Sequence, residues 1–125
     1  LSLVGSEMCI RDRKRDFRMT DALGSRDKKR LWVLYREAID QGKEPEEIHG
    51  LLFWQIKNMI IAAESKDASE AGLNPFVFRK AKESLKYYSK EDLCAVSSRM
   101  ITVYHEARQG KIDFVLGLEK LLLTL

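Results

Sequence analysis

This sequence of 125 residues has little cysteine, little proline and no long hydrophobic run. Its two cysteines, Cys9 and Cys94, lie far apart and fit no CxxC spacing, which argues against a disulfide framework or a zinc knuckle. The longest apolar runs, such as residues 59–63, fall far short of the roughly 20 residues that a membrane span needs. The sequence therefore predicts a protein of a reducing compartment, cytoplasmic and without membrane contact.

The motifs of common enzyme classes are also missing. No GxxxxGK[ST] segment is present to cradle a phosphate, and no GxGxxG turn is present to bind a dinucleotide. His49 and His105 stand alone, outside any HExxH pair, and no residue at a catalytic spacing activates Cys94. We expect no catalytic residue, no metal and no cofactor, and hence no active site within this chain.

The residues that are present suit one folded domain. Hydrophobic residues make up 45% of the chain and charged residues 33%, with a net charge of +3. A chain of this size buries roughly two-thirds of its unfolded surface, which is enough for a hydrophobic core. The positive charge is concentrated in residues 14–30, with seven cations against three acids. This stretch either meets nucleic acid or an acidic partner, or forms the solvated start of a helix.

The first thirteen residues, LSLVGSEMCIRDR, need a separate interpretation. They contain no initiating Met and no alanine-type cleavage site, so they do not form a convincing signal peptide. They look like the translated sequencing-adapter read-through found at the ends of reading frames from environmental DNA. We therefore expect residues 1–13 to be a non-native artefact or disordered, residues 14–125 to form a helical domain, and the natural chain to extend further upstream.

Helical periodicity and capping signals dominate the rest of the chain, and no segment reads convincingly as a strand. The fold class is predicted to be all-α, a compact bundle of about five to six helices, with residues 66–74 as a longer loop. The predicted helices are a short one at 17–23, one from Ser25 to the stop at Gly42, one from Pro45 to about 65, one beginning at Asn74 and Pro75, one capped by Ser89 and ending before Gly110, and one from about Asp113 to the chain end.

Two of these helices carry a second apolar stripe opposite their main one. Trp54 and Ile61 form the first, and Leu116 and Leu123 form the second. Two apolar faces imply two neighbours, so these four residues are candidates for a subunit interface. The alternative is that other helices of the same domain bury them.

One cluster of cations is a candidate for phosphate contact. Arg79, Lys82 and Lys86 recur at three- and four-residue spacing and line one helix edge, with Phe76 and Tyr87 on the adjoining side. Glu83 interrupts this edge. An ordinary solvated helix surface explains the same pattern.

The order of segments resembles the C-terminal domain of the bacterial DNA polymerase III delta subunit, over nearly all of residues 17–125. The most specific parts are Thr20-Asp21-Ala22-Leu23-Gly24 before Arg26-Asp27, then Gly42, Pro45 and Ile48 before Leu51-Leu52 and Gln55, and then the Asn74-Pro75-Phe76 helix start. The last two helices, with a small polar turn before a leucine-rich terminus, are similar in layout.

This resemblance implies a non-catalytic part in loading the sliding clamp during DNA replication. In that family the domain forms one segment of a helical collar, together with domains of the delta-prime and gamma/tau subunits. The sliding clamp would be met only through the N-terminal region that this chain lacks, and DNA only indirectly. The family belongs to the DNA polymerase III holoenzyme, but no residue here matches a catalytic one. The alternative is a free-standing helical nucleic-acid-binding or regulatory domain.

Overall fold

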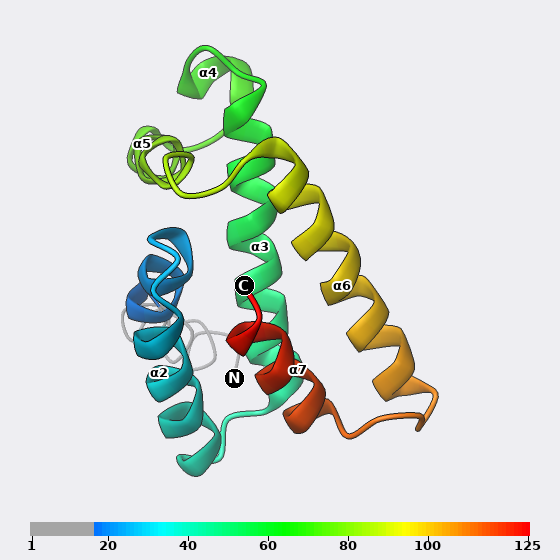
Figure 1. Ribbon diagram of the computed structural model, residues 1–125. Coiled ribbons are helices and arrows are strands. Elements are labelled where there is room, and N and C mark those ends of the chain that lie inside the picture. The colour runs from blue at the N-terminus through cyan, green and yellow to red at the C-terminus, as the bar shows by residue number, and fades with distance from the viewer. Residues whose placement is uncertain (1–16) are drawn as a thin grey trace, which may run out of the picture.

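The computed structural model describes residues 17–125, and over this range the chain is helical, with turns and loops but no strand (Figure 1). The predicted all-α class is therefore confirmed. A helical segment at residues 17–24 comes first. It is followed by α2 (Lys28–Asp40), α3 (Pro45–Ala63), α4 (Ala68–Ala71), α5 (Pro75–Ser84), α6 (Lys90–Arg108) and α7 (Phe114–Leu123). The interpretation of residues 1–13 lies outside the described residues.

The helix count is slightly above the predicted five to six, because residues 66–74 are not wholly a loop. They contain the one-turn helix α4, whose N-cap Asp67 accepts a hydrogen bond from the backbone N–H of Glu70. Gly72 then ends this turn with a left-handed φ of 72°, a conformation that costs glycine little. A single capped turn has too few residues to show helical periodicity, so the sequence pattern did not reveal it.

Most of the longer helices begin at side-chain caps, and α3 begins at the predicted Pro45 without one. Asn74 caps α5, Ser89 and Asp92 form a capping box at the start of α6, and Asp113 caps α7. The predicted start of α2 at Ser25 is wrong. Asp27 is the N-cap instead, because its carboxylate accepts from the backbone N–H of Arg30 at 3.1 Å.

Helix α3 runs through the middle of the domain and is packed against α5, α6 and α7 (Figure 1). Its fully buried Leu52, Ile56 and Met59 lie at the centre of the hydrophobic core. Burial of each such side chain contributes roughly 1.5–3 kcal/mol relative to its exposure. Helix α2 reaches this core from the other side, through its contact with α7. None of the helices within residues 17–125 combines the length and the apolar character that crossing a membrane requires.

One histidine belongs to this core. His49 on α3 is 7% exposed, and its Nε2 lies 2.8 Å from the Met100 carbonyl oxygen on α6. The ring also lies among Phe53, Tyr104 and Phe114, with centroid distances of 5.4–6.1 Å. Burial lowers the pKa of His49 below its ordinary 6.5, although the hydrogen bond to Met100 opposes this shift. The neutral ring is therefore the form that fits the fold.

We expect the stability of the domain to depend on pH through His49. Because its pKa is lower in the folded state, stability is constant above the ordinary pKa of 6.5 and falls as the pH drops from there through the folded-state pKa. Urea unfolding between about pH 5 and about pH 7.5 measures the slope of the unfolding free energy against pH. His49→Gln, whose amide nitrogen still reaches Met100, flattens the slope. A slope that persists in this variant would assign the effect to another group.

A second prediction concerns the close approach of residues 17–24 to α5. A Cβ atom on Gly24 would collide with Ser84 Oγ. Gly24→Ala therefore destabilises the domain by about 1–3 kcal/mol, as overpacking does in a full core. Adding Ser84→Ala removes the colliding oxygen and restores most of this loss, which thermal or urea unfolding of both variants will show. Equal stability of the single variant and the parent would contradict the close contact.

Candidate functional site

The outer face of α7 is the most exposed apolar surface among the predicted site residues. Leu116 is 62% exposed and Leu123 49%, two turns apart on the same side of the helix. The opposite side of α7 is core, with Leu118, Leu121 and Leu122 nearly fully buried. Helix α7 is thus anchored on one side by α2, α3 and α6 and shows two leucines to the outside. We call Leu116 and Leu123 the α7 face.

Polar contacts fix the seam between α7 and α2. The Tyr35 hydroxyl on α2 donates to the Val115 carbonyl at 2.7 Å, and burial raises the pKa of Tyr35 to about 12, so it stays a donor. The Trp32 indole N–H donates to Glu119 Oε2 at 2.8 Å. Glu119 lies three residues after Leu116 and four before Leu123, so half-exposed Trp32 lies beside the α7 face.

The other two predicted interface residues lie elsewhere. Trp54 is 37% exposed and Ile61 is half-buried, both on α3. Trp54 borders a cleft formed by residues 17–24, α3 and α5, and no residue of α7 borders that cleft. The structure therefore places Trp54 and the α7 face on separate surfaces and does not bring the four residues together.

This cleft has a volume of about 430 Å³. Four of its bordering side chains are exposed aromatic rings, between 37% and 48% accessible, which we call the aromatic cleft rim: Phe17, Trp54, Phe76 and Tyr87. Deeper in the cleft lie polar residues that are almost completely buried: Thr20, Gln55 and Ser84. The cleft thus combines an apolar rim with hydrogen-bonding groups at its floor.

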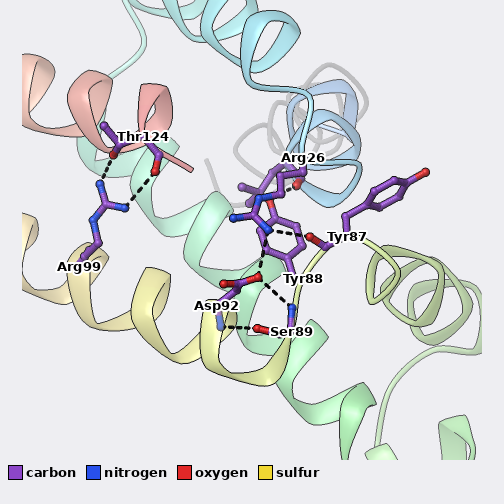
Figure 2. Close-up of polar contacts among 8 residues, drawn as sticks. Arg26, Tyr87, Tyr88, Ser89, Asp92, Arg99 and Thr124 are labelled. Carbon is purple, nitrogen blue, oxygen red and sulfur yellow. Dashed lines mark hydrogen bonds and ion pairs between the residues drawn. The ribbon is translucent and has the colours of Figure 1, made fainter.

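A polar cluster around Arg26 holds one wall of the cleft in place (Figure 2). Arg26 Nη1 donates to the Tyr87 carbonyl at 2.8 Å and pairs with Asp92 Oδ2 at 3.0 Å. Its guanidinium lies 4.8 Å from the centre of the Tyr88 ring, and the Tyr88 hydroxyl donates to the Leu23 carbonyl. The segment that carries Tyr87 is thereby tied to the end of the helical segment 17–24.

Arg26 itself has an unusual backbone. Its φ of 57° is left-handed, a conformation that costs a residue with a Cβ roughly 1–2 kcal/mol. The side-chain contacts to Tyr87, Tyr88 and Asp92 offset this cost. The Ser89 backbone N–H and the Arg26 guanidinium hold the pKa of Asp92 below its usual value, so the carboxylate stays charged for both contacts.

The predicted phosphate contacts lie on a different side of α5 from the cleft. Arg79 lies over the Phe76 ring, with 5.4 Å to its centroid, and Lys82 lies over the Phe78 ring at 5.5 Å. Lys86 is exposed, and none of the three cations borders the cleft. The expectation that all three line one helix edge is therefore wrong for Lys86: Arg79 and Lys82 lie on α5, which ends at Ser84, and Lys86 lies in the turn that follows.

No group of three or more His, Cys, Asp or Glu side chains within residues 17–125 is arranged to hold a metal ion. His49 is a packed core residue and His105 is exposed. Cys94 is exposed and free.

The cleft itself was missed by sequence reasoning, although one signal pointed to it. The segments that carry the family resemblance each contribute lining residues: Thr20, Asp21 and Gly24 from the first, Gln55 from the second and Phe76 from the third. These residues are separated by up to 56 positions and come together only when residues 17–24, α3 and α5 pack. The presence of these segments together in the family resemblance was the available signal, but periodicity within single helices does not show that they meet.

Comparisons with known proteins agree with the fold. The family described as "DNA polymerase III delta subunit, C-terminal domain" matches residues 14–125. The structure is similar to that of the Bacillus subtilis DNA clamp loader delta protein, with a TM-score of 0.76 and 21% sequence identity. The match covers 88% of this chain and 35% of that protein, so the chain spans about a third of its length. No curated protein matches the sequence.

Proposed function

This chain belongs to the family formed by the C-terminal domains of DNA polymerase III delta subunits, and from this membership we propose that it is a non-catalytic assembly domain of a replication clamp loader. The family predicted from the sequence is thereby confirmed. Its place in the cytoplasm and its association with other clamp-loader subunits are parts of the same proposal. The partners are the collar domains of the delta-prime and gamma/tau subunits, and the sliding clamp is met only through a region outside this chain.

The observation that carries the assembly role is the exposure of the α7 face. A helix that served only as the outer wall of a bundle would carry charged or polar residues on its outer side. Here that side carries Leu116 and Leu123, with half-exposed Trp32 beside them. Aromatic and aliphatic side chains grouped on an otherwise polar surface are typical of the centre of a protein interface. The α7 face is therefore our candidate for the surface that binds a neighbouring subunit.

We expect the double change Leu116→Asp and Leu123→Asp to weaken association with the cognate gamma/tau and delta-prime collar domains by at least about a hundredfold, since each charge must be desolvated at an apolar interface. Analytical ultracentrifugation of the mixed domains measures this loss. Circular dichroism should show unchanged helicity, because both side chains are already exposed.

The matched control is Ile101→Asp on α6, since Ile101 is 44% exposed and borders a different hollow, between α3 and α6. This variant keeps full association. If the α7 variant instead loses its helical signal, the two leucines belong to the core. If the control and the α7 variant weaken association equally, the α7 face is not the interface.

A second candidate function is contact with nucleic acid along α5, whether in a free-standing domain or within the clamp loader. The observation that favours it is the pairing of cations with aromatic rings, Arg79 over Phe76 and Lys82 over Phe78, with the exposed Lys86 in the turn that follows α5. Positive charge next to stacking surfaces is the combination that single-stranded nucleic acids bind.

Salt dependence tests this second candidate. If the three cations contact phosphates, the affinity for fluorescein-labelled (dT)20 falls as the salt concentration rises. Together the three cations account for about two units of the slope of log affinity against log salt concentration. Changing Arg79, Lys82 and Lys86 to Gln removes that part of the slope in fluorescence anisotropy titrations. The control, with the exposed Lys57, Lys66 and Lys111 changed to Gln, has the same net charge. Equal loss in both variants would indicate attraction by general positive charge, without a specific α5 site.

A further inference from the structure

The cleft has the features of a binding site. The assembly role proposed for the α7 face makes no use of it. Its rim holds Phe17, Trp54, Phe76 and Tyr87 from three separate parts of the fold, each between 37% and 48% exposed. Its volume of about 430 Å³ lies within the range of clefts that bind ligands. Contiguous exposed aromatic surface of this kind marks places where proteins bind a partner.

The floor of the cleft contains an unpartnered amide. Gln55 on α3 is only 8% exposed, and within residues 17–125 its side chain makes no hydrogen bond. Asn58 Nδ2 is the sole fully enclosed side-chain nitrogen or oxygen without a partner in that part of the chain, so the Gln55 amide is not sealed in the core. It meets the cleft that it borders. A ligand that offers a carbonyl at this point would give the amide the hydrogen-bond partner that it lacks within the described residues.

The charges around the cleft cancel. Asp21 pairs with Lys80 at 3.5 Å, and the remaining charged residues at the border are Arg30 and Glu83, one of each sign. A polyanion entering the cleft would meet two carboxylates, and a polycation would meet two cations. Balanced charge with an aromatic rim complements an uncharged ligand.

The floor also selects the backbone conformation of the ligand. An α-helix uses its carbonyls internally and presents only side chains to a groove. A polyproline II segment has no internal hydrogen bonds, so its carbonyls are free to accept from a donor such as the Gln55 amide. Proline-rich segments bind in aromatic-lined grooves because they are already extended and lose little entropy.

We propose that the cleft between residues 17–24, α3 and α5 binds an uncharged, proline-rich segment of a partner protein in the polyproline II conformation. Its proline rings pack between the side chains of the aromatic cleft rim, and one of its backbone carbonyls accepts a hydrogen bond from Gln55 Nε2. This site goes beyond the assembly role and uses no residue of the α7 face.

The full chain, labelled with ¹⁵N, allows a direct test by NMR with blocked nonaproline as the probe. The Gln55 side-chain NH₂ signals and the Trp54 indole signal shift in a saturable way, while the Trp32 indole, bonded to Glu119 beside the α7 face, serves as the reference within the chain. A blocked glycine–serine nonapeptide, which has the same length but no polyproline II preference, leaves all three signals unchanged.

Two variants test the parts of the site separately. Gln55→Leu weakens nonaproline binding about tenfold without loss of stability, because it removes a buried polar group that has no partner in the free domain. Phe76→Ala, at an exposed ring, weakens it by a similar factor, whereas Ile101→Ala leaves it unchanged. The Leu116→Asp and Leu123→Asp variant retains full peptide binding, so failure of the assembly proposal and failure of this one are distinguishable.

Three results would overturn the proposal. The first is the absence of any shift with nonaproline at the Gln55 and Trp54 signals. The second is an equal response to the glycine–serine peptide, which would show non-specific contact. The third is a response of these signals to (dT)12 and none to nonaproline, which would assign the cleft to nucleic acid bases. Unchanged affinity in Gln55→Leu would refute the hydrogen bond at the floor.

Discussion

The burial of α3 on several sides is the constraint on which the rest of the domain depends. Neighbouring helices surround it, so side chains on more than one of its faces must leave water. Most of them are aliphatic, but three polar ones are buried as well: His49, Gln55 and Asn58. Each buried polar group needs a partner or costs free energy. These three groups are accommodated in different ways, which underlie the expected pH response at His49, a local cost at Asn58 and the candidate cleft at Gln55.

The three cases differ in physical terms. His49 is satisfied by the Met100 carbonyl and packed among three aromatic rings, so it joins α3 to α6 as a neutral core residue. Asn58 is enclosed with its Nδ2 unpaired, which is a cost that the aliphatic packing around it must offset. Gln55 avoids full enclosure because residues 17–24 and α5 leave a cleft above it. Arg26 holds the segment that carries Tyr87, one wall of the cleft, by donating to the Tyr87 carbonyl (Figure 2). It does so although the Arg26 backbone is left-handed.

Much of the fold was predictable from the sequence because it depends on local signals. The period of apolar residues and the caps at Asn74, Ser89 and Asp113 placed three helix starts correctly. The start of α2 was misplaced because Ser25 and Asp27 are both good capping residues, and only the actual hydrogen bond to Arg30 distinguishes them. Helix α4 was missed because one turn carries no periodicity.

The candidate sites were harder to predict because they depend on how helices meet. Helical spacing correctly showed that Leu116, Leu123 and Trp54 lie away from the main stripes of their helices, and all three are exposed. Spacing within a helix does not show which exposed residues of different helices are neighbours, so it gave Trp54 as an interface candidate without showing that Trp54 borders the cleft. The partners of Trp54 at the rim come from residues 17–24 and from α5, and their proximity is a property of tertiary packing alone.

The separation of the α7 face from the cleft has a consequence for how the domain can act. One surface offers exposed leucines without buried polar groups, which suits a broad apolar contact with another folded domain. The other offers separated aromatic rings over an unpaired amide, which suits a thin, extended ligand. No residue of α7 borders the cleft, so the two surfaces share no side chain. A contact made by α7 alone would therefore leave the side chains of the cleft uncovered.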